Sequence, residues 1–414
     1  MEWIKRRLDS DRAILYSIVA FVIIGGFVYS LMLGDKLRFQ DEGHYLRMAN
    51  NLIKNRIYSY DINGVYPTAF HPPGYTLILA SSISLGGGFV TLRMLNFICL
   101  GISIILLSGI LKKYGFPLGA KWVPLMLLYY PVIFFTASTL YLQIIATTLF
   151  ILTIYLVDRW SLKFWDVFFI GLIYGFLILI SPSFILVLPV MFIAPYLLKK
   201  NISIRFIIFF LLGISLIMTP WVIRNYMVFN RFVLLSNNAG KTFILGNSEN
   251  ARPNTGEGID LSRYDNEIKQ LNLDEVETDK YYKKKAFEWI RNNPSDFLKL
   301  YIMKFFNYFN YRNELATKSQ QSSLRDFIVF ITYYPLLILA LIRLVFIKRY
   351  PVRDIELLFM AFYLMSAFAN ALFLTRIRYR LPYDLLLICL SAISLDYLKM
   401  YFKTKTNPEK RLSI

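Results

Sequence analysis

The sequence contains few of the residues that build disulfides and transition-metal sites. Only two cysteines and two histidines occur among 414 residues. Both cysteines, Cys99 and Cys389, lie inside apolar runs, so we expect neither a disulfide framework nor a zinc site. Two histidines are also too few for a histidine-built metal centre. The residues identify no cofactor, although a divalent cation stays open.

Nucleotide-binding and hydrolase motifs are also missing. The chain has no Walker loop, no glycine-rich dinucleotide turn and no nucleophile elbow. These absences disfavour a nucleotide-driven pump and an enzyme that uses a nucleotide sugar in a cytosolic domain.

Long apolar runs dominate the sequence instead. Hydrophobic residues make up 56% of the chain, against roughly 45–50% in soluble domains. They gather in runs such as 14–33 and 206–221, and runs of about 20 apolar residues span membranes. The first run lacks a cleavage site, so we expect a retained helix rather than a signal peptide. The sequence therefore predicts an all-α polytopic membrane protein with about 10–12 transmembrane helices.

The distribution of basic residues predicts the topology. The formal charge is +19, and the positive residues gather at the ends of apolar runs, where they set orientation and meet anionic lipid rather than nucleic acid. Lys5, Arg6 and Arg7 precede the first run, which predicts a cytoplasmic N-terminus. We divide the chain into an N-terminal transmembrane module (1–223) with a first external loop (34–72), a large external loop (224–326), and C-terminal helices with a cytoplasmic tail (327–414).

Two adjacent carboxylates, Asp41 and Glu42, follow the first apolar run. Apolar residues then recur at helical spacing, which predicts a short amphipathic helix on the membrane surface. Carboxylates favour the N-terminus of a helix, so capping explains one acid. Capping does not explain two adjacent acids beside a membrane, where an unpaired charge is costly. We therefore predict that Asp41 and Glu42 are catalytic.

Basic residues on the predicted outer side form the second candidate group. Arg376, Arg378 and Arg380 precede the last apolar run and break the positive-inside rule, which marks them as functional candidates. Headgroup anchoring is the alternative. Arg224 begins the large external loop, and His71 and Lys304 are predicted to join the group, although an interfacial ring would also explain His71.

Together these groups fit sugar transfer from a lipid phosphate. An acceptor hydroxyl must lose its proton as it attacks the anomeric carbon, and a carboxylate is a suitable base. The departing phosphate gains charge, which arginine stabilises through two parallel hydrogen bonds. An inverting transferase needs only one carboxylate on the attacking face.

Several motifs resemble those of the GT-C glycosyltransferases, closest to the family 39 group of protein O-mannosyltransferases and lipid A aminoarabinose transferases. They are Phe39-x-Asp41-Glu42-x-x-Tyr45, the segment Pro220-Trp221-Val222-Ile223-Arg224-Asn225 with Gly246-Asn247 after it, and Arg378-Tyr379-Arg380-Leu381-Pro382. The resemblance covers nearly the whole chain.

The resemblance implies a polyprenyl-phosphate sugar donor, an inverting reaction on the outer face of the cytoplasmic membrane, and Asp41 as the catalytic residue. Tyr45 matches the tyrosine of the family motif. Tyr75 and Asn247 complete the expected substrate-binding residues. The acceptor is expected to be a lipid-linked compound, a glycan or a protein, with no nucleic acid as partner.

Two positions depart from the family pattern. His71 stands where the aminoarabinose transferase has a lysine that contacts lipid phosphate, so a permanent charge is lost. Gln143 stands where many members have a further acid, which puts a second catalytic acid or metal ligand in doubt. A flippase for a polyprenyl-linked glycan is the alternative function, and a non-catalytic scaffold is the third. No internal repeat of the kind common in transporters is visible.

Overall fold

The computed structural model describes residues 2–200, 204–254, 258–312 and 322–406, so parts of the predicted external loop and tail lie outside it. Within these ranges the chain forms seventeen α-helices and one 3₁₀ helix. Its only β-contact there is an isolated bridge between Ser59 and Pro67. The prediction of an all-α protein is confirmed.

The helices follow one another with short connections along most of the chain. The N-terminal half contains α1 (Glu2–Leu33), α2 (Gln40–Asn55), α3 (Gly74–Ser84), α4 (Phe89–Lys113), α5 (Pro117–Tyr129), α6 (Pro131–Ala137), α7 (Gln143–Arg159), α8 (Phe164–Ile180), η1 (Pro182–Val187), α9 (Leu188–Leu197) and α10 (Ile204–Phe229). The second half contains α11 (Ala239–Gly246), α12 (Ser262–Gln270), α13 (Glu275–Asn292), α14 (Pro294–Asn307), α15 (Ser323–Val345), α16 (Asp354–Ala371) and α17 (Ile377–Thr406).

Six helices of the described chain are long and apolar enough to cross a membrane. They are α1 from Asp11 onward, α4, α10, α15, α16 and α17 up to Lys403. A seventh crossing results if α5 and α6, which meet at 69°, form one broken span. Three shorter apolar helices, Gly74–Ser84, Phe164–Ile180 and Pro182–Leu197, fall short of this length, so the described chain has six or seven candidate spans against the predicted 10–12.

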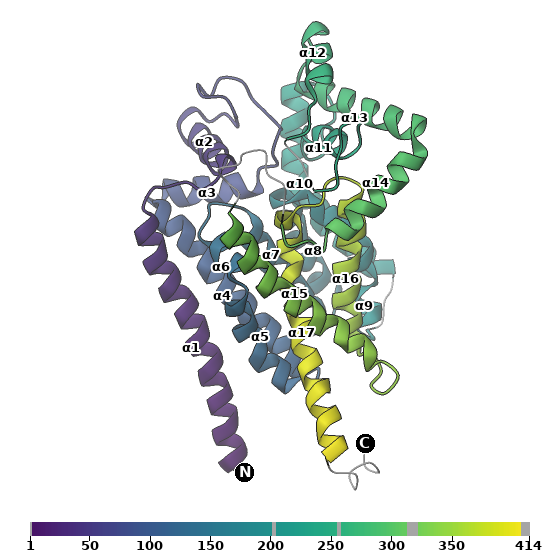
Figure 1. Ribbon diagram of the computed structural model, residues 1–414. Coiled ribbons are helices and arrows are strands. Elements are labelled where there is room, and N and C mark those ends of the chain that lie inside the picture. Colours follow the sequence, from purple (N-terminus) through teal and green to yellow (C-terminus); the bar gives the residue numbers. More distant parts are fainter. Residues whose placement is uncertain (1, 201–203, 255–257, 313–321, 407–414) are drawn as a thin grey trace.

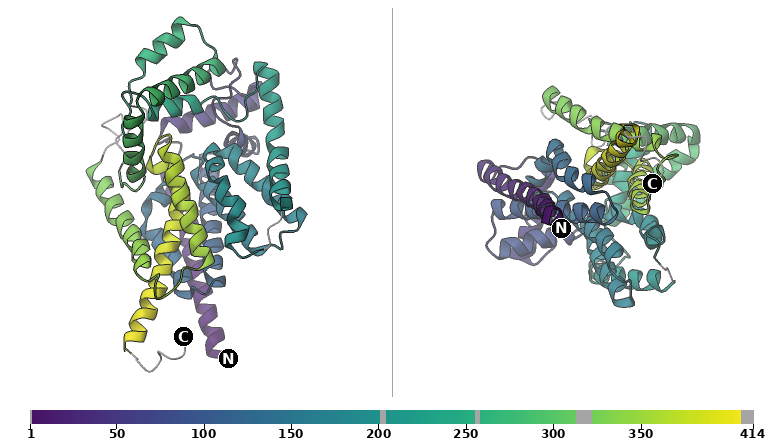
Figure 2. Two further views of the ribbon diagram at one scale, coloured as in Figure 1. Left: turned by 90° about the vertical axis from the view of Figure 1, so that its right-hand side faces the viewer. Right: turned by 90° about the horizontal axis from the view of Figure 1, so that it is seen from below.

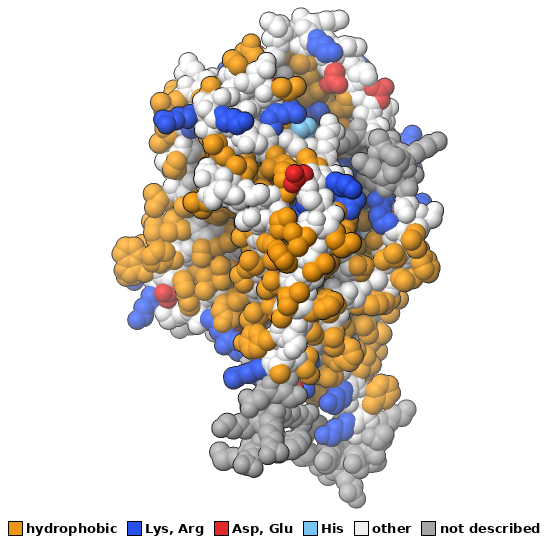
Figure 3. Space-filling model, turned by 90° about the vertical axis from the view of Figure 1, so that its left-hand side faces the viewer, with side chains coloured by type: hydrophobic (Ala, Val, Ile, Leu, Met, Phe, Trp, Pro, Cys, Tyr) orange, Lys and Arg blue, Asp and Glu red, His pale blue; other side chains and the backbone are white. Residues whose placement is uncertain are grey.

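The outer helices expose apolar side chains that only lipid can cover. In α1 only 22% of the membrane-length window is buried, against 61% in α16 and α17. Phe21 and Ile24 of α1 are each 63% exposed. Figure 3 shows the resulting apolar belt, with a row of Lys and Arg side chains above it. An apolar face of this extent identifies an integral membrane protein.

Glycines bring α8 and α10 into close contact. A Cβ atom on Gly171 would lie 2.3 Å from the carbonyl oxygen of Phe210, and one on Gly213 would lie 2.3 Å from that of Phe168. Such close backbone approach through small residues is a common way to pack membrane helices, because lipid provides no hydrophobic driving force between them.

The helices α11 to α14 lie at one end of the bundle, on the same side as α2 (Figures 1 and 2). They share a small core of their own that includes Ile244, Tyr264 and Tyr282. Glu275, in the first turn of α13, ties this group to the first loop. Its carboxylate accepts hydrogen bonds from the Thr68 hydroxyl at 2.7 Å and the Ala69 amide at 2.8 Å. The two predicted external segments are therefore in contact.

Candidate active site

Asp41 is the centre of a compact polar cluster at the start of α2. Its Oδ2 atom accepts a hydrogen bond from Nη1 of Arg378 at 2.9 Å and another from the Tyr141 hydroxyl. The same Nη1 atom donates to the Tyr141 oxygen at 3.2 Å, so the three side chains bond one another. The Asp41 and Arg378 side chains each remain 30% exposed, which leaves both accessible to a ligand.

Three distant parts of the chain supply this cluster. Asp41 lies in the first turn of α2, where a carboxylate interacts favourably with the helix dipole. Tyr141 lies in the turn between α6 and α7, and its ring packs edge-on against Phe39 at 5.7 Å. Arg378 lies in the first turn of α17. The cluster therefore sits at the end of a candidate membrane span.

The surroundings of Asp41 favour its ionised form. Burial raises the pKa of the carboxyl, but the Arg378 guanidinium and the Tyr141 hydroxyl outweigh burial and lower the pKa below its usual value. Asp41 is therefore a carboxylate at neutral pH, paired with a fixed cation.

Aromatic rings line one side of the cluster. The ring of Tyr45 lies 5.0 Å from that of His71 and 5.1 Å from that of Tyr75, which it meets edge-on, and 6.3 Å from that of Tyr141. Burial lowers the pKa of His71 to about 4, so its imidazole is neutral at pH 7. The predicted residues Tyr45, His71 and Tyr75 are therefore brought together beside Asp41.

A second histidine also lies near Asp41. Nδ1 of His44 is 3.9 Å from Oδ1 of Asp41 and 2.7 Å from the Tyr60 hydroxyl oxygen. The His44 and Tyr60 rings also contact each other, at 4.7 Å between centroids.

Glu42 has a different environment from Asp41. Its side chain is fully buried, and Oε2 accepts a hydrogen bond from the Arg38 amide at 3.0 Å. Burial raises the pKa of this carboxyl. The contact with the preceding turn is of the capping type considered above, so the geometry places only Asp41 of the two acids at the accessible surface of the cluster.

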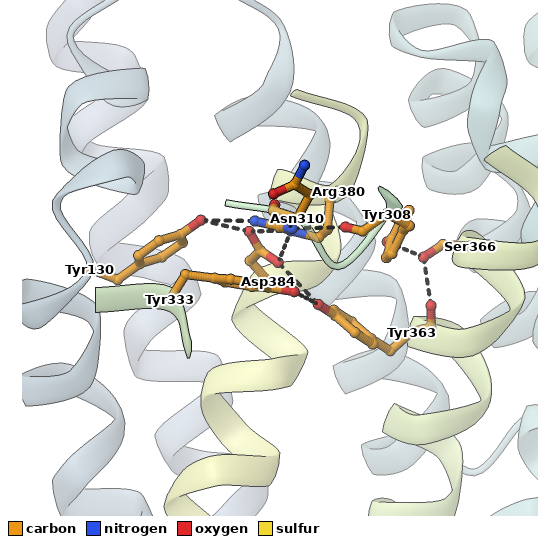
Figure 4. A network of polar contacts seen from close by, with 8 residues as sticks. All are labelled: Tyr130, Tyr308, Asn310, Tyr333, Tyr363, Ser366, Arg380 and Asp384. Atoms are coloured by element: carbon orange, nitrogen blue, oxygen red, sulfur yellow. Dashed lines mark hydrogen bonds and ion pairs between the residues drawn. The ribbon is translucent and has the colours of Figure 1, made fainter. Parts of the chain in front are cut away.

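The three predicted arginines separate in space. Residues two apart on a helix point about 200° from each other, so Arg378 and Arg380 of α17 cannot face the same site. Arg380 is buried, and its Nε atom lies 3.0 Å from Oδ1 of Asp384. Figure 4 shows this pair among its neighbours, where Nη1 of Arg380 donates to the Tyr308 carbonyl at 2.8 Å. Arg376 precedes the helix and is half-buried.

Arg380 thus connects α17 to the end of α14. Its Nη1 also donates to the Asn310 carbonyl at 2.7 Å, and its guanidinium lies 3.7 Å from the centroid of the Tyr333 ring. A buried charge needs such partners, since leaving one unpaired is costly. These contacts give Arg380 a structural role.

Three further predicted residues join segments at the end of the bundle where α2 and α11 to α14 lie. Nη1 of Arg224 donates to the Thr68 carbonyl at 2.8 Å and thereby fixes the first loop to α10. Lys304 is fully buried, and its Nζ donates to Oδ1 of Asn247 at 3.2 Å. The Asn247 amide in turn donates to the Leu372 carbonyl at 2.8 Å. None of these bonds reaches the Asp41 cluster, and a substrate-binding role for these residues stays a prediction.

Sequence reasoning did not identify Tyr141, His44 and Tyr60. The available signal for Tyr141 was its place in the polar turn Ser138-Thr139-Leu140-Tyr141, between two apolar runs. His44 follows Asp41 by three residues, the spacing of neighbours on a helix. Tyr60 had no comparable signal.

Metal-binding groups are also absent from the part of the chain that the structure describes. No set of three or more His, Cys, Asp or Glu side chains is placed there to hold one ion. Dependence of transfer on a divalent cation is therefore tested by activity with and without a chelator.

Comparisons with known proteins find a distant likeness among solved structures. No family model and no curated protein matches the chain. Among solved structures it is similar to ArnT from Cupriavidus metallidurans, crystallised with undecaprenyl phosphate, with a TM-score of 0.47 and 13% identity. The match covers 92% of this chain but 60% of that one, so the chain spans less than two thirds of ArnT. A likeness this distant carries no argument about activity, substrate or partner.

Proposed function

We propose that this protein is an inverting membrane glycosyltransferase of the GT-C type. It moves a sugar from a polyprenyl-phosphate donor to an acceptor hydroxyl on the outer face of the cytoplasmic membrane. The observation that carries the proposal is the accessible pair of Asp41 and Arg378, a carboxylate and a guanidinium 2.9 Å apart at the end of a membrane helix. These groups supply the base and the phosphate-binding cation that the reaction needs.

The pair suggests how the reaction is controlled. Without substrate, Arg378 lowers the pKa of Asp41, which keeps the carboxylate ionised but weakens it as a base. A donor phosphate that binds Arg378 would compete with Asp41 for the guanidinium. Asp41 would then be more basic in the donor complex, where a base is needed.

The transfer step forms one bond at the anomeric carbon and breaks another. The acceptor oxygen attacks the anomeric carbon and forms the new glycosidic bond, while its proton passes to Asp41. The bond between the anomeric carbon and the phosphate oxygen breaks, and the leaving polyprenyl phosphate keeps the electron pair. Arg378 stabilises the charge that develops on this oxygen. A single carboxylate on the attacking face is sufficient, which agrees with the inward position of Glu42.

The aromatic side chains wall the carboxylate on one side. Tyr45, Tyr75 and Tyr141 pack against one another there and are buried. Such rings exclude water from the reacting groups, while the neutral His71 adds a polar group without a competing charge.

The test is transfer of radiolabelled hexose from a polyprenyl phosphate by purified protein in detergent, with crude membrane lipid as acceptor. Wild type should label a product, and Asp41→Asn should not, while both show the same monodisperse elution and thermal midpoint. Equal transfer by the two proteins would exclude Asp41 as the base. Donor binding without transfer, together with movement of labelled lipid across vesicles, would instead support a flippase.

A further inference from the structure

The side of α2 that faces away from Asp41 borders a hollow of about 540 Å³, here called the α2 hollow. Its lining residues on α2 recur every three or four positions and therefore form one helix face. They are Gly43, Leu46, Arg47, Asn50, Asn51, Lys54 and Asn55, and Leu37, Ile62 and Asn63 complete the lining. Asn50 is about half a turn around the helix from Asp41, so the hollow and the catalytic cluster lie on opposite faces.

The loop that closes the α2 hollow is fixed to the helix. The Asn51 amide donates to the carbonyls of Ser59 at 3.1 Å and Asp61 at 2.9 Å. The carboxylate of Asp61 accepts hydrogen bonds from the amides of Gly64 at 2.6 Å and Tyr66 at 2.7 Å. Its negative charge is therefore stabilised by amides within the loop. A site held in this way is formed before any ligand arrives, which limits the entropy lost on binding.

The chemistry of the lining favours an anion. Arg47 and Lys54 line the hollow, and no acidic residue does. Within the described part of the chain, neither cation has a carboxylate within ion-pair distance. The side chains of Asn50, Asn55 and Asn63 add donors and acceptors around the two charges.

The surroundings favour a sugar polymer over a bilayer lipid. Figure 1 places α2 and its loop beyond the end of α1, the first candidate membrane span. The loop exposes 79% of Ile62, which lines the hollow, and 76% of Tyr66, four residues further along the same loop. An exposed aromatic ring on this loop can contact the apolar face of a sugar while the amides of the lining bind its hydroxyls.

We propose that the α2 hollow binds a negatively charged glycan segment, bearing carboxylate or phosphate groups, of the acceptor. Arg47 and Lys54 pair with the anionic groups, and the asparagines bind hydroxyls. Its use as an acceptor site rests on the proposed function, because Asp41 lies six residues from Arg47, about 9 Å along the same rigid helix. The glycan charge thus selects the acceptor on one face of α2, and transfer occurs at the other.

The test measures binding of labelled oligosaccharides to the full-length protein in detergent by fluorescence anisotropy. The probes are an oligogalacturonate, a phosphomannan oligomer, a neutral dextran oligomer and a DNA oligonucleotide of matched charge. The first two separate the carboxylate source from the phosphate source. The Arg47→Gln/Lys54→Gln double variant is compared with Lys269→Gln/Lys280→Gln, which removes the same charge from exposed positions of the external helices.

Wild type should bind at least one anionic glycan about tenfold more tightly than dextran, and the double variant should lose about that factor, as expected for two exposed charge contacts. The control variant should bind like wild type, and Asn50→Ala should weaken the glycan but not DNA. Equal affinity for dextran, or DNA binding as tight as glycan binding, would overturn the inference. So would unchanged binding by the double variant.

The outcome is separable from that of the proposed function. Asp41→Asn should bind the anionic glycan like wild type, since the hollow lies on the other face of α2. If binding follows the expected pattern but no sugar is transferred, the glycosyltransferase proposal fails and the glycan site stands. If Asp41-dependent transfer occurs without charge-dependent binding, the glycan site fails and the glycosyltransferase proposal stands.

Discussion

Asp41 and Arg378 are 337 residues apart in the chain, and their side chains meet at 2.9 Å. The contact joins α2 to the start of α17, the last candidate membrane span, so neither helix can form the site alone. It also pairs a group suited to accept a proton with one suited to hold a phosphate.

We expect Asp41→Asn to lower kcat by about 10²–10⁴-fold, the usual contribution of a general base. The amide keeps the shape of the side chain but cannot accept the acceptor proton at neutral pH. Sugar-transfer rates at saturating donor measure the effect. Glu42→Gln is the matched control, because its side chain is buried beneath the same turn. If folded Glu42→Gln lost as much kcat as Asp41→Asn, the assignment of Asp41 as the base would be wrong.

Arg378 should be sensitive to shape as well as charge. Arg378→Lys keeps one positive charge but loses the fork that binds a carboxylate and a phosphate side by side. We expect it to lower kcat/KM for the donor by about 10–100-fold, and Arg378→Gln to lower it further, since hydrogen bonds between ionised groups are the strong ones. Steady-state kinetics with varied donor measure both. An unchanged donor KM and kcat in Arg378→Gln would exclude a phosphate role.

Tyr141→Phe should move the acid limb of the pH–rate profile to higher pH. The hydroxyl of Tyr141 stabilises the ionised form of Asp41, so its removal raises the pKa of Asp41. Activity that requires the carboxylate is then lost at a higher pH. The measurement is kcat/KM between pH 4 and pH 8. Tyr114→Phe is the control, because its hydroxyl bonds Asp158 rather than Asp41 and should leave the limb unmoved. A shift toward lower pH would contradict the assignment.

The sequence was sufficient for the parts of the fold that depend on local pattern. Amphipathic spacing predicted a helix after Asp41, and α2 runs over Gln40–Asn55. In the same way α13 begins after the capping box of Asp274 and Glu277 and ends at Asn292, shortly before Pro294. Caps, prolines and apolar periodicity are encoded within a few residues, which explains this agreement.

The site required information that local pattern does not contain. The start of α17 at Ile377, ahead of the last apolar run, determines which way each arginine points. Arg378 therefore meets Asp41 while Arg380 meets Asp384. Tyr141 approaches Asp41 across 100 residues because α6 and α7 meet in a turn, a relationship set by helix packing alone.

Lys304 should make stability depend on pH above neutrality. Burial lowers the pKa of this lysine to about 7, whereas in the unfolded chain it is near 10.4. Between these values the unfolded state binds more protons, so the free energy of unfolding rises with pH, by up to about 1.4 kcal/mol per pH unit. Thermal midpoints in detergent from pH 6 to pH 10 measure this rise in stability.

The matched variants for this prediction are Lys304→Met and Lys299→Met. Lys304→Met should be less stable than wild type, because the carbonyls of Gly246 and Phe373 lose a donor, and the deficit should grow from pH 7 to pH 10. Lys299 is exposed, so its variant should follow the wild-type curve. A deficit for Lys304→Met that is constant with pH would mean that the lysine stays charged in the folded protein.

The contact between α8 and α10 should not tolerate a single added methyl group. In Gly171→Ala the new Cβ would lie 2.3 Å from the Phe210 carbonyl oxygen, and backbone atoms cannot rotate away as a side chain does. The helices must separate, at a cost of about 1–3 kcal/mol or more. In Gly109→Ala the nearest atom is 4.0 Å away, on the Tyr155 ring, so this variant should be neutral or gain up to about 1 kcal/mol from helix propensity. Thermal midpoints of the two purified variants decide the point, because equal midpoints would show that close backbone contact does not hold these helices together.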